Sequence, residues 1–165
     1  MEWIRKVEGI ERVAVLVNPT LDDALMIAAL DGIDSLQLHG NESQEFCERL
    51  VAAGAEIIKA LPATPALLEI ALSDYRCARV LLDTPVRGRF GGTGEMFDWL
   101  MAAELVRRNP GLEIIIAGGL TPSNVGAAIA LATPAGVDVS GGVELSPSRK
   151  DHAVVQHFVV AAKRS

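Results

Sequence analysis

The sequence predicts an α/β protein built on a parallel sheet, because short apolar segments alternate with helical segments along all 165 residues. The apolar segments are rich in β-branched residues and nearly continuous, as in parallel strands that are buried on both faces. Half of the residues are hydrophobic and only 4% are aromatic, so the expected core consists of Ala, Val, Leu and Ile. No linker or low-complexity stretch interrupts the series, which indicates a single domain.

The expected strands are short and each precedes a helical segment, so the chain reads as six βα units in a row. Right-handed crossovers between parallel strands then follow from the general chirality of such units. The strands are expected at Val13–Val17, Ser35–Leu38, Glu56–Lys59, Arg79–Leu82, Glu113–Ala117 and Gly136–Val139.

Helix starts and stops support this alternation. Thr20 can cap a helix together with Asp23 three residues on. Ser43 precedes an amphipathic stretch that stops at Gly54, a common residue after a helix end. Further helices are expected to begin at Thr64-Pro65 and Thr121-Pro122, each an N-cap followed by proline, and to cover Met96–Arg108 and Asp151–Lys163.

Composition excludes several functional classes. A net charge of −6 argues against a nucleic-acid-binding protein, which would show a basic face. The apolar runs are too short to span a bilayer, and the N-terminus has no apolar signal region. Cys47 and Cys77 are too few for a disulfide framework or a thiolate metal site, and we expect inert thiols. A cytoplasmic protein with no nucleic-acid or membrane partner is expected.

The position of the glycines distinguishes between two parallel-sheet architectures. A dinucleotide-binding fold needs a glycine-rich turn after its first strand, and Asn18-Pro19-Thr20 lacks one. Glycines instead follow the last three strands. In eightfold barrels, the loops after strands seven and eight often form a phosphate site. The loops over 117–120 and 140–142 can bind phosphate through backbone amides, although each alone would also suit an ordinary tight turn.

If those two loops follow strands seven and eight, the chain begins at the third unit of a barrel. A complete barrel has roughly 200 residues or more, and two further units would account for the difference. We therefore expect an incomplete (β/α)8 TIM barrel, a single partial domain over residues 1–165. Residues 1–12 would be the remnant of the second helix and a linker.

Five motifs occur in order and with suitable spacing: LQLHGNES (36–43), VLLDT (80–84), GGTGEMFDW (91–99), IIAGGLTPSNV (115–125) and GVDVSGGVE (136–144). Together they resemble phosphoribosylanthranilate isomerase, an enzyme of tryptophan biosynthesis, and AVLVNP (14–19) resembles its third strand. The resemblance implies an eightfold barrel without metal or cofactor. It also implies an Amadori rearrangement of N-(5'-phosphoribosyl)anthranilate, a phosphorylated small molecule, to an aminoketose.

The resemblance assigns the general acid to Asp83, which would protonate the ribose ring oxygen. A lone carboxyl group at the end of an apolar strand is also expected at the site face, partly withdrawn from water. A helix cap or loop hydrogen bonder is the alternative. The resemblance assigns phosphate binding to Gly118, Gly119, Ser140, Gly141 and Gly142. It makes Gly91, Gly92 and Gly94 part of a mobile loop, for which a flexible turn is the alternative.

His39 and Asp138 each have two interpretations. The resemblance places His39 near the substrate, but a histidine at a strand end can equally hold its loop by a hydrogen bond. Asp138 lies two residues before Ser140, hence on the same side of the strand, and the resemblance places it near the anthranilate ring. A buried aspartate paired with a backbone group or a cation is the alternative.

The family's general base, a cysteine in a Cys-Gly-(Ile/Leu)-Thr motif, has no counterpart in these 165 residues. Its arginine for the anthranilate carboxylate, in a Ser-Pro-Arg-like segment, is also absent. Losing a general base typically reduces the rate by about 10²–10⁴, so we expect little or no isomerase activity from this polypeptide alone. In SPSRKD (146–151) the family usually has Pro-Gly before the basic residue.

Open barrel edges would expose unpaired backbone groups, so we expect repacking, edge-to-edge self-association or a need for the missing part. Two other functions remain open. One is a non-catalytic phosphate-ligand-binding or assembly subunit that completes its barrel with a partner. The other is a different phosphate-binding barrel enzyme, such as an epimerase or indole-glycerol-phosphate synthase, against which the LQLHG and FDW motifs weigh.

Overall fold

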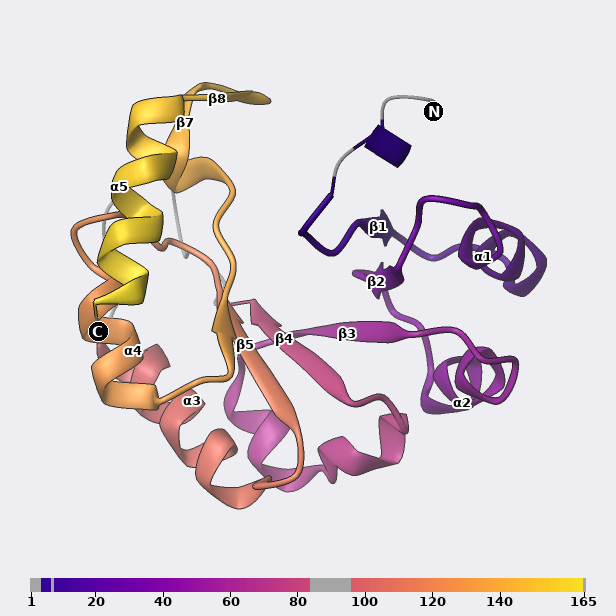
Figure 1. The fold of residues 1–165 in the computed structure, drawn as a ribbon. Coiled ribbons are helices and arrows are strands. Elements are labelled where there is room, and N and C mark those ends of the chain that lie inside the picture. Colours follow the sequence, from indigo (N-terminus) through magenta and orange to yellow (C-terminus); the bar gives the residue numbers. More distant parts are fainter. Residues whose placement is uncertain (1–3, 7, 84–95, 165) are drawn as a thin grey trace. The chain divides into compact units, whose positions relative to one another are not determined.

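The computed structural model describes residues 4–6, 8–83 and 96–164, which form an α/β fold with a parallel six-stranded sheet (Figure 1). The strands follow the order β1-β2-β3-β4-β5-β6, so neighbours in the sequence are neighbours in the sheet. Their bounds are β1 Val13–Leu16, β2 Ser35–Leu38, β3 Ile57–Pro62, β4 Arg79–Asp83, β5 Glu113–Ala117 and β6 Gly136–Val137. All six lie where the apolar runs predict them, and two have the predicted bounds.

Helices follow the strands as the alternation predicts, with one exception. The α-helices are α1 Leu21–Ala28, α2 Gln44–Ala52, α3 Met96–Arg108, α4 Val125–Ala132 and α5 His152–Lys163. After β3 the chain forms two short 3₁₀ helices, η2 Pro65–Glu69 and η3 Leu72–Tyr75, instead of an α-helix. Ile70 adopts extended backbone between them, and the Thr64 side chain makes no capping hydrogen bond.

The predicted N-cap Thr20 is confirmed in atomic detail, and the structure adds side-chain caps at Ser43 and Asp151. The Asp23 amide donates to the Thr20 hydroxyl at 3.1 Å, and the Phe46 amide donates to the Ser43 hydroxyl at 3.1 Å. Asp151 accepts from two amides at the start of α5. These bonds satisfy amides that the first helical turn leaves without a partner, and they span only two or three residues.

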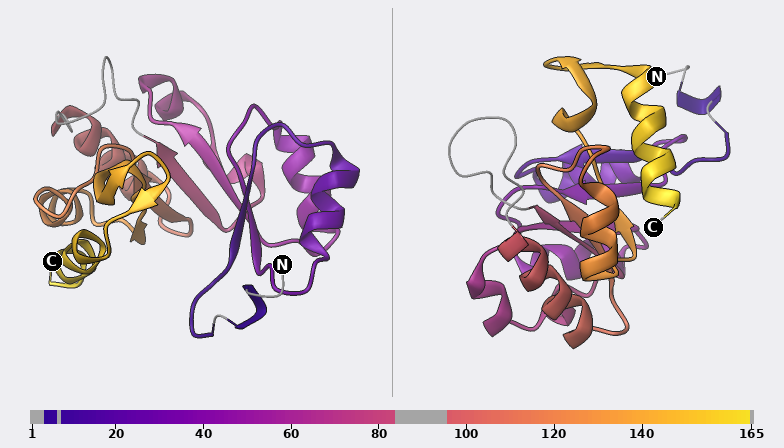
Figure 2. Two further views of the ribbon diagram at one scale, coloured as in Figure 1. Left: turned by 90° about the horizontal axis from the view of Figure 1, so that it is seen from above. Right: turned by 90° about the vertical axis from the view of Figure 1, so that its left-hand side faces the viewer.

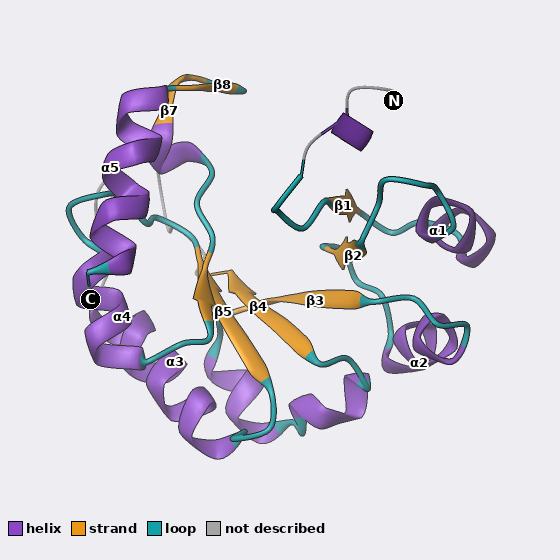
Figure 3. Ribbon diagram, in the orientation of Figure 1, coloured by secondary structure: helices purple, strands orange, loops and turns teal. Residues whose placement is uncertain are grey.

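A short antiparallel hairpin between the sheet and α5 was not expected. It consists of β7 Glu144–Ser146 and β8 Arg149–Lys150, directly before the first turn of α5 (Figure 3). The strands are too short to give a periodic signal. The two residues of the turn are Pro147 and Ser148, and Ser148 has a φ of 67°. A proline followed by a positive φ is the pattern of a type II turn, which favours glycine at the second position.

The chain forms two compact units, which we describe separately. The first comprises residues 1–61 and 72–80. In it α1 packs on α2, on the same side of β1 and β2 (Figure 1). The core of this unit contains the fully buried Ala24, Leu36, Leu38, Cys47, Leu50 and Leu72.

β1 is one of the two end strands of the strand order, and one of its side chains is largely exposed. It pairs with β2 in parallel, from Val13 opposite Ser35 to Leu16 opposite Leu38. Val15 is 58% exposed, whereas β3 is buried over nearly its whole length. Side chains of a strand point to the two faces of its sheet, so the exposure of Val15 shows that one face of β1 is uncovered. The expectation that this strand is buried on both faces is therefore wrong.

The second unit comprises residues 62–71 and 81–165. Its helices pack in chain order, α3 on α4 and α4 on α5 (Figure 2). Its core contains the buried Leu82, Leu105, Ile114, Ile116, Leu120 and Val125. In the described parts of the chain, none of the helices has the length and apolar character needed to cross a membrane.

Candidate functional site

The loop after β5 has a backbone that requires glycine twice. Gly118 has a φ of 84° and Gly119 a φ of 64°, both in the left-handed region. A residue with a Cβ is strained there, by roughly 1–2 kcal/mol. Two successive residues of this kind turn the chain sharply from the buried end of β5 toward α4.

The same loop is fastened to the start of α4. The Asn124 carboxamide accepts from the Thr121 amide at 2.7 Å and donates to the Gly119 carbonyl at 3.0 Å. The Val125 amide donates to the Thr121 carbonyl at 3.1 Å, but residues 121–124 form a turn and α4 begins at Val125 with Asn124 as its N-cap, so the predicted start at Thr121-Pro122 is too early. The Thr121 hydroxyl pairs with the Ser123 hydroxyl at 2.9 Å, however, and Asn124 supplies the side-chain bond that was expected from threonine.

The loop after β6 lies directly against the loop after β5. A Cβ built on Gly142 would overlap the carbonyl oxygen of Leu120 and crowd the Thr121 methyl group. Gly142 therefore has to be glycine for the two loops to meet. A Cβ on Gly141 would meet nothing within 4 Å. The structure thus brings together the two glycine loops that the sequence pairs as a phosphate site.

A lysine that the sequence did not single out holds the second loop. The Lys150 ammonium donates to the Ser140 carbonyl at 2.9 Å and to the Ser140 hydroxyl at 3.2 Å. It also pairs with Glu144 Oε1 at 2.8 Å. Lys150 reaches the loop because the hairpin places it opposite Glu144. No spacing rule connects residues 140 and 150 before the hairpin is known.

Asp83 and Asp138 both belong to the second unit. Asp83 is the last residue of β4, half-buried, and its carbonyl accepts from the Ala63 amide at 2.9 Å. Because the carboxyl ends of parallel strands share one edge, Asp83 lies at the same edge of the sheet as the loop after β5. Asp138 is exposed and its amide donates to the Ile116 carbonyl at 2.8 Å. Asp138 is therefore not a buried residue, which contradicts the burial that the alternative assumed.

His39 belongs to the first unit, where it follows β2. Its side chain is exposed, with Nδ1 3.0 Å from the Gln37 carboxamide nitrogen, and its amide donates to the Leu16 carbonyl at 2.8 Å. This contact fits a loop-holding histidine and leaves the ring accessible. Gly91, Gly92 and Gly94 of the expected mobile loop lie outside the described residues.

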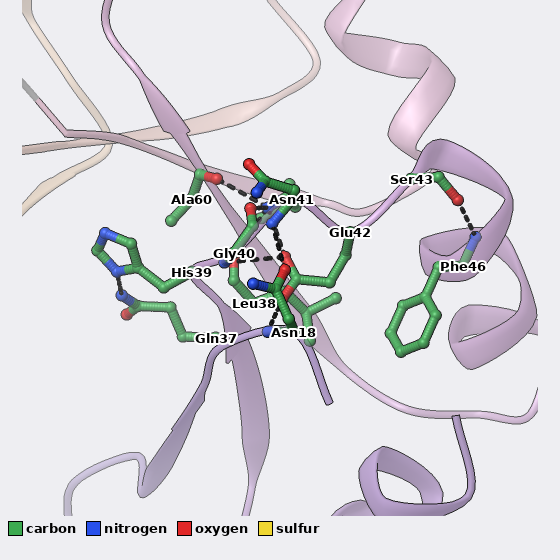
Figure 4. A network of polar contacts seen from close by, with 11 residues as sticks. Asn18, Gln37, Leu38, His39, Gly40, Asn41, Glu42, Ser43, Phe46 and Ala60 are labelled. Carbon is green, nitrogen blue, oxygen red and sulfur yellow. Dashed lines mark hydrogen bonds and ion pairs between the residues drawn. The ribbon is translucent and has the colours of Figure 1, made fainter. Parts of the chain in front are cut away.

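A buried ion pair joins β3 to the segments that follow β1 and β2, and Figure 4 shows Glu42 of this pair among the polar groups around it. Lys59 and Glu42 lie 2.8 Å apart, with side chains only 1% and 2% exposed. The Lys59 ammonium also donates to the Leu38 and Gly40 carbonyls at 3.1 and 2.8 Å. Glu42 accepts from the Asn18 and Gly40 amides at 2.8 and 3.0 Å. The pair thus provides hydrogen-bond partners for backbone groups directly before and after His39, and for the amide of Asn18 after β1.

Opposing effects act on the carboxyl group of this pair. Burial raises the pKa of Glu42, but the hydrogen bonds from Lys59 and from the Asn18 amide outweigh it. The net pKa lies below the ordinary value, so the carboxylate is charged and paired at neutral pH. In the sequence, Lys59 reads as part of a strand and Glu42 as a loop residue, and only the fold pairs them.

The two cysteines are unsuited to acid–base chemistry. Cys47 is fully buried and Cys77 is 7% exposed. Burial raises the pKa of Cys47 to about 11 and raises the pKa of Cys77 as well. Both are therefore protonated thiols at neutral pH. Within the described ranges, no group of three or more His, Cys, Asp or Glu side chains is placed to hold a metal ion.

Comparison with known proteins gives a consistent result. Residues 1–161 match the family model described as N-(5'-phosphoribosyl)anthranilate (PRA) isomerase. An N-(5'-phosphoribosyl)anthranilate isomerase of Thermotoga neapolitana is 44% identical over 152 residues, which are 92% of this chain and 72% of the relative.

Solved structures of the same kind are also similar. The phosphoribosyl anthranilate isomerase of Thermotoga maritima superimposes with a TM-score of 0.84 at 34% identity, over 99% of this chain and 80% of its own. A phosphoribosyl anthranilate isomerase in complex with reduced 1-(o-carboxyphenylamino)-1-deoxyribulose 5-phosphate gives a TM-score of 0.79 at 32% identity, over 99% of this chain and 79% of its own.

Proposed function

The chain belongs to the PRA isomerase family of tryptophan biosynthesis, and from this premise we propose how its residues serve the reaction. The substrate is N-(5'-phosphoribosyl)anthranilate and the product is 1-(2-carboxyphenylamino)-1-deoxyribulose 5-phosphate. An acid protonates the ribose ring oxygen, the ring opens, and a base removes the proton from C2'. No metal or cofactor takes part.

The ribose 5'-phosphate binds between the loops after β5 and β6, through Gly118, Gly119, Ser140, Gly141 and Gly142. The observation that carries this assignment is the close approach of Gly142 to Leu120, which joins the two loops. Glycine lets amide groups approach an anion without an intervening Cβ, and the adjacent start of α4 adds partial positive charge. The glycines are then needed for two reasons: they permit the backbone geometry of the loops, and they let the phosphate group reach the backbone amides.

Asp83 is the general acid. It lies at the end of β4, next to β5 in the strand order, and so at the edge of the sheet that carries the diglycine loop. A phosphate held at that edge would position the ribose ring near the carboxyl group. Asp138, exposed between β6 and Ser140, faces the anthranilate end of the substrate, and the family resemblance adds His39, after β2, as a further substrate-binding residue.

The general base is not among these 165 residues. They contain no Cys-Gly-(Ile/Leu)-Thr segment, and the buried thiols Cys47 and Cys77 cannot replace it. The six βα units correspond to the third to eighth of an eightfold barrel, in line with coverage of 72% of the relative's length. Alone, the polypeptide then binds the phosphate end of the substrate but turns it over at least about 10²-fold more slowly than a family member with its base.

Isomerase turnover with and without an added N-terminal fragment that carries the cysteine segment tests this proposal. We expect turnover to appear when the fragment is added to the 165-residue polypeptide. This turnover should fall when Asp83 of the 165-residue polypeptide is replaced by Asn. Unchanged turnover in D83N would contradict the acid assignment.

A non-catalytic phosphate-binding subunit is the second candidate, favoured by the missing base segment and by the exposed β1 edge. Phosphate binding that persists while the fragment restores no turnover would support this candidate over the enzyme.

A further inference from the structure

The ammonium group of Lys150 has three acceptors, all within one small cluster. They are the Ser140 carbonyl at 2.9 Å, the Ser140 hydroxyl at 3.2 Å and Glu144 Oε1 at 2.8 Å. An ammonium group has three N–H donors and no acceptor. Every donor of Lys150 is thus engaged, and the lysine has none left to bind a ligand directly.

The bond to the Ser140 hydroxyl determines what that hydroxyl can do. A serine hydroxyl carries one hydrogen and two lone pairs. Because Lys150 donates to the oxygen, the hydroxyl hydrogen remains to be donated elsewhere. Ser140 is exposed, so this hydrogen can reach a ligand at the loop surface. Lys150 thereby biases Ser140 toward the role of a donor.

The second bond fixes the loop backbone in the same place. Lys150 holds the Ser140 carbonyl, and the same carbonyl accepts from the Val143 amide at 3.4 Å. The Asp151 amide donates to the Val143 carbonyl at 2.8 Å, which ties the hairpin to the loop from the other side. Gly142, between these contacts, lies against Leu120. The lysine therefore orients both the hydroxyl and the amide turn that follows it.

We propose that Lys150 is a positioning residue that sets Ser140 as a hydrogen-bond donor to the phosphate group of the ligand. This inference rests on the proposed phosphate site and adds a residue to it. A phosphate dianion only accepts hydrogen bonds, so a hydroxyl held as a donor matches it. Glu144 holds the lysine in place and offsets its charge. Lys150 therefore favours phosphate binding through its hydrogen bond to Ser140 and not through long-range attraction between its charge and the phosphate.

A double-mutant cycle on the 165-residue chain tests the inference. The variants are Lys150→Met, Ser140→Ala and the combination, and the probes are inorganic phosphate and ribose 5-phosphate, titrated by calorimetry and amide NMR shifts. We expect each single variant to weaken binding about three- to tenfold, the effect of one lost hydrogen bond to a charged group. The combination should bind no more weakly than Ser140→Ala alone, because the lysine acts through that serine.

Two further variants separate position from charge. Arg149→Met removes the same charge one residue away, from an exposed side chain, and should leave phosphate affinity within twofold of wild type. Lys150→Arg keeps the charge and several donors, and should retain more affinity than Lys150→Met. If Lys150→Met fails to fold, Lys150→Gln takes its place in the cycle, because it removes the charge and one of the three donors while keeping a polar side chain.

The outcomes distinguish the inference from its premise. Wild-type protein that binds neither probe overturns the phosphate site and the role of Lys150 with it. Wild-type binding that Lys150→Met and Arg149→Met weaken equally, or that Ser140→Ala leaves unchanged, overturns the role of Lys150 alone. Additive losses in the combined variant would do the same.

Discussion

Gly142 approaches the carbonyl oxygen of Leu120 so closely that no side chain fits between them. This contact joins two loops that are about twenty residues apart in the chain. The loop after β5 supplies two glycines in the left-handed region, and the loop after β6 supplies the residue that packs against it. The contact is therefore the structural basis of the proposed phosphate site.

Replacing Gly142 by Ala is expected to separate the two loops. The added methyl group would overlap backbone, so the free energy of unfolding should fall by about 1–3 kcal/mol, as for other overpacked positions. Phosphate affinity should fall with it. Gly141→Ala is the matched control, because a Cβ there meets open space, and its unfolding midpoint should stay near wild type. Equal urea midpoints for Gly142→Ala and Gly141→Ala would show that Gly142 does not pack closely against Leu120.

Ser148 occupies a position that favours glycine. Its φ of 67° follows Pro147 in the hairpin turn, where a side chain is strained. We expect Ser148→Gly to raise the free energy of unfolding by about 0.5–1 kcal/mol, since the relief of strain exceeds the entropy of the added glycine. Ser146→Gly, in strand β7, should instead lower it. Urea denaturation of both variants gives the comparison, and a destabilised Ser148→Gly would refute the turn assignment.

Because Lys59 and Glu42 form a buried pair, we expect a single replacement to lower the free energy of unfolding more than replacement of both residues does. Lys59→Met leaves a carboxylate buried without its cation, and breaking a buried pair in this way costs about 3–5 kcal/mol. The double variant Lys59→Met and Glu42→Leu should be more stable than Lys59→Met alone. Equilibrium unfolding at neutral pH measures the stability of both variants. If the double variant is less stable than Lys59→Met, the unpaired carboxylate is not the cause of the destabilisation.

The surface pair of Asp34 and Arg12 predicts an acid-dependent loss of stability. Hydrogen bonds from the Arg12 side chain and amide lower the pKa of Asp34 from 3.8 to about 2. A lowered pKa in the folded state adds stability at pH above 3.8, and this contribution disappears as the pH falls toward 2. Arg12→Met should therefore lose less stability than wild type between pH 4 and pH 2. Parallel acid titrations, followed by circular dichroism, would test this, and identical curves would count against it.

The β1 edge predicts self-association through exposed valines. Val15 is 58% and Val17 is 66% exposed, beside a strand edge that can accept another strand. We expect light scattering to show association that grows with concentration and that Val15→Lys reduces. Met26→Lys adds the same charge to the exposed face of α1 and should have a smaller effect. A monodisperse monomer at all concentrations would rule this out.

Local features of the molecule follow from the sequence because their causes lie within a few residues. The strand positions come from runs such as Glu113–Ala117, and the caps at Thr20 and Ser43 bond to amides three residues away. The motifs at the carboxyl ends of the strands also identify the family. The sequence predicts less well where several neighbouring side chains can bond the same turn. The Thr121 hydroxyl pairs with the Ser123 hydroxyl, and the Asn124 side chain accepts from the Thr121 amide instead.

The sequence is enough to establish the order of strands and helices, the residues at the strand ends and the family. Which side chains and loops meet depends on the folded chain, as for Gly142 with Leu120, Lys150 with Ser140, and Lys59 with Glu42. The physical reason is that periodicity and capping act over one helical turn or strand. These contacts join different loops and strands, and they form only when hairpin and sheet pairing bring the backbones together.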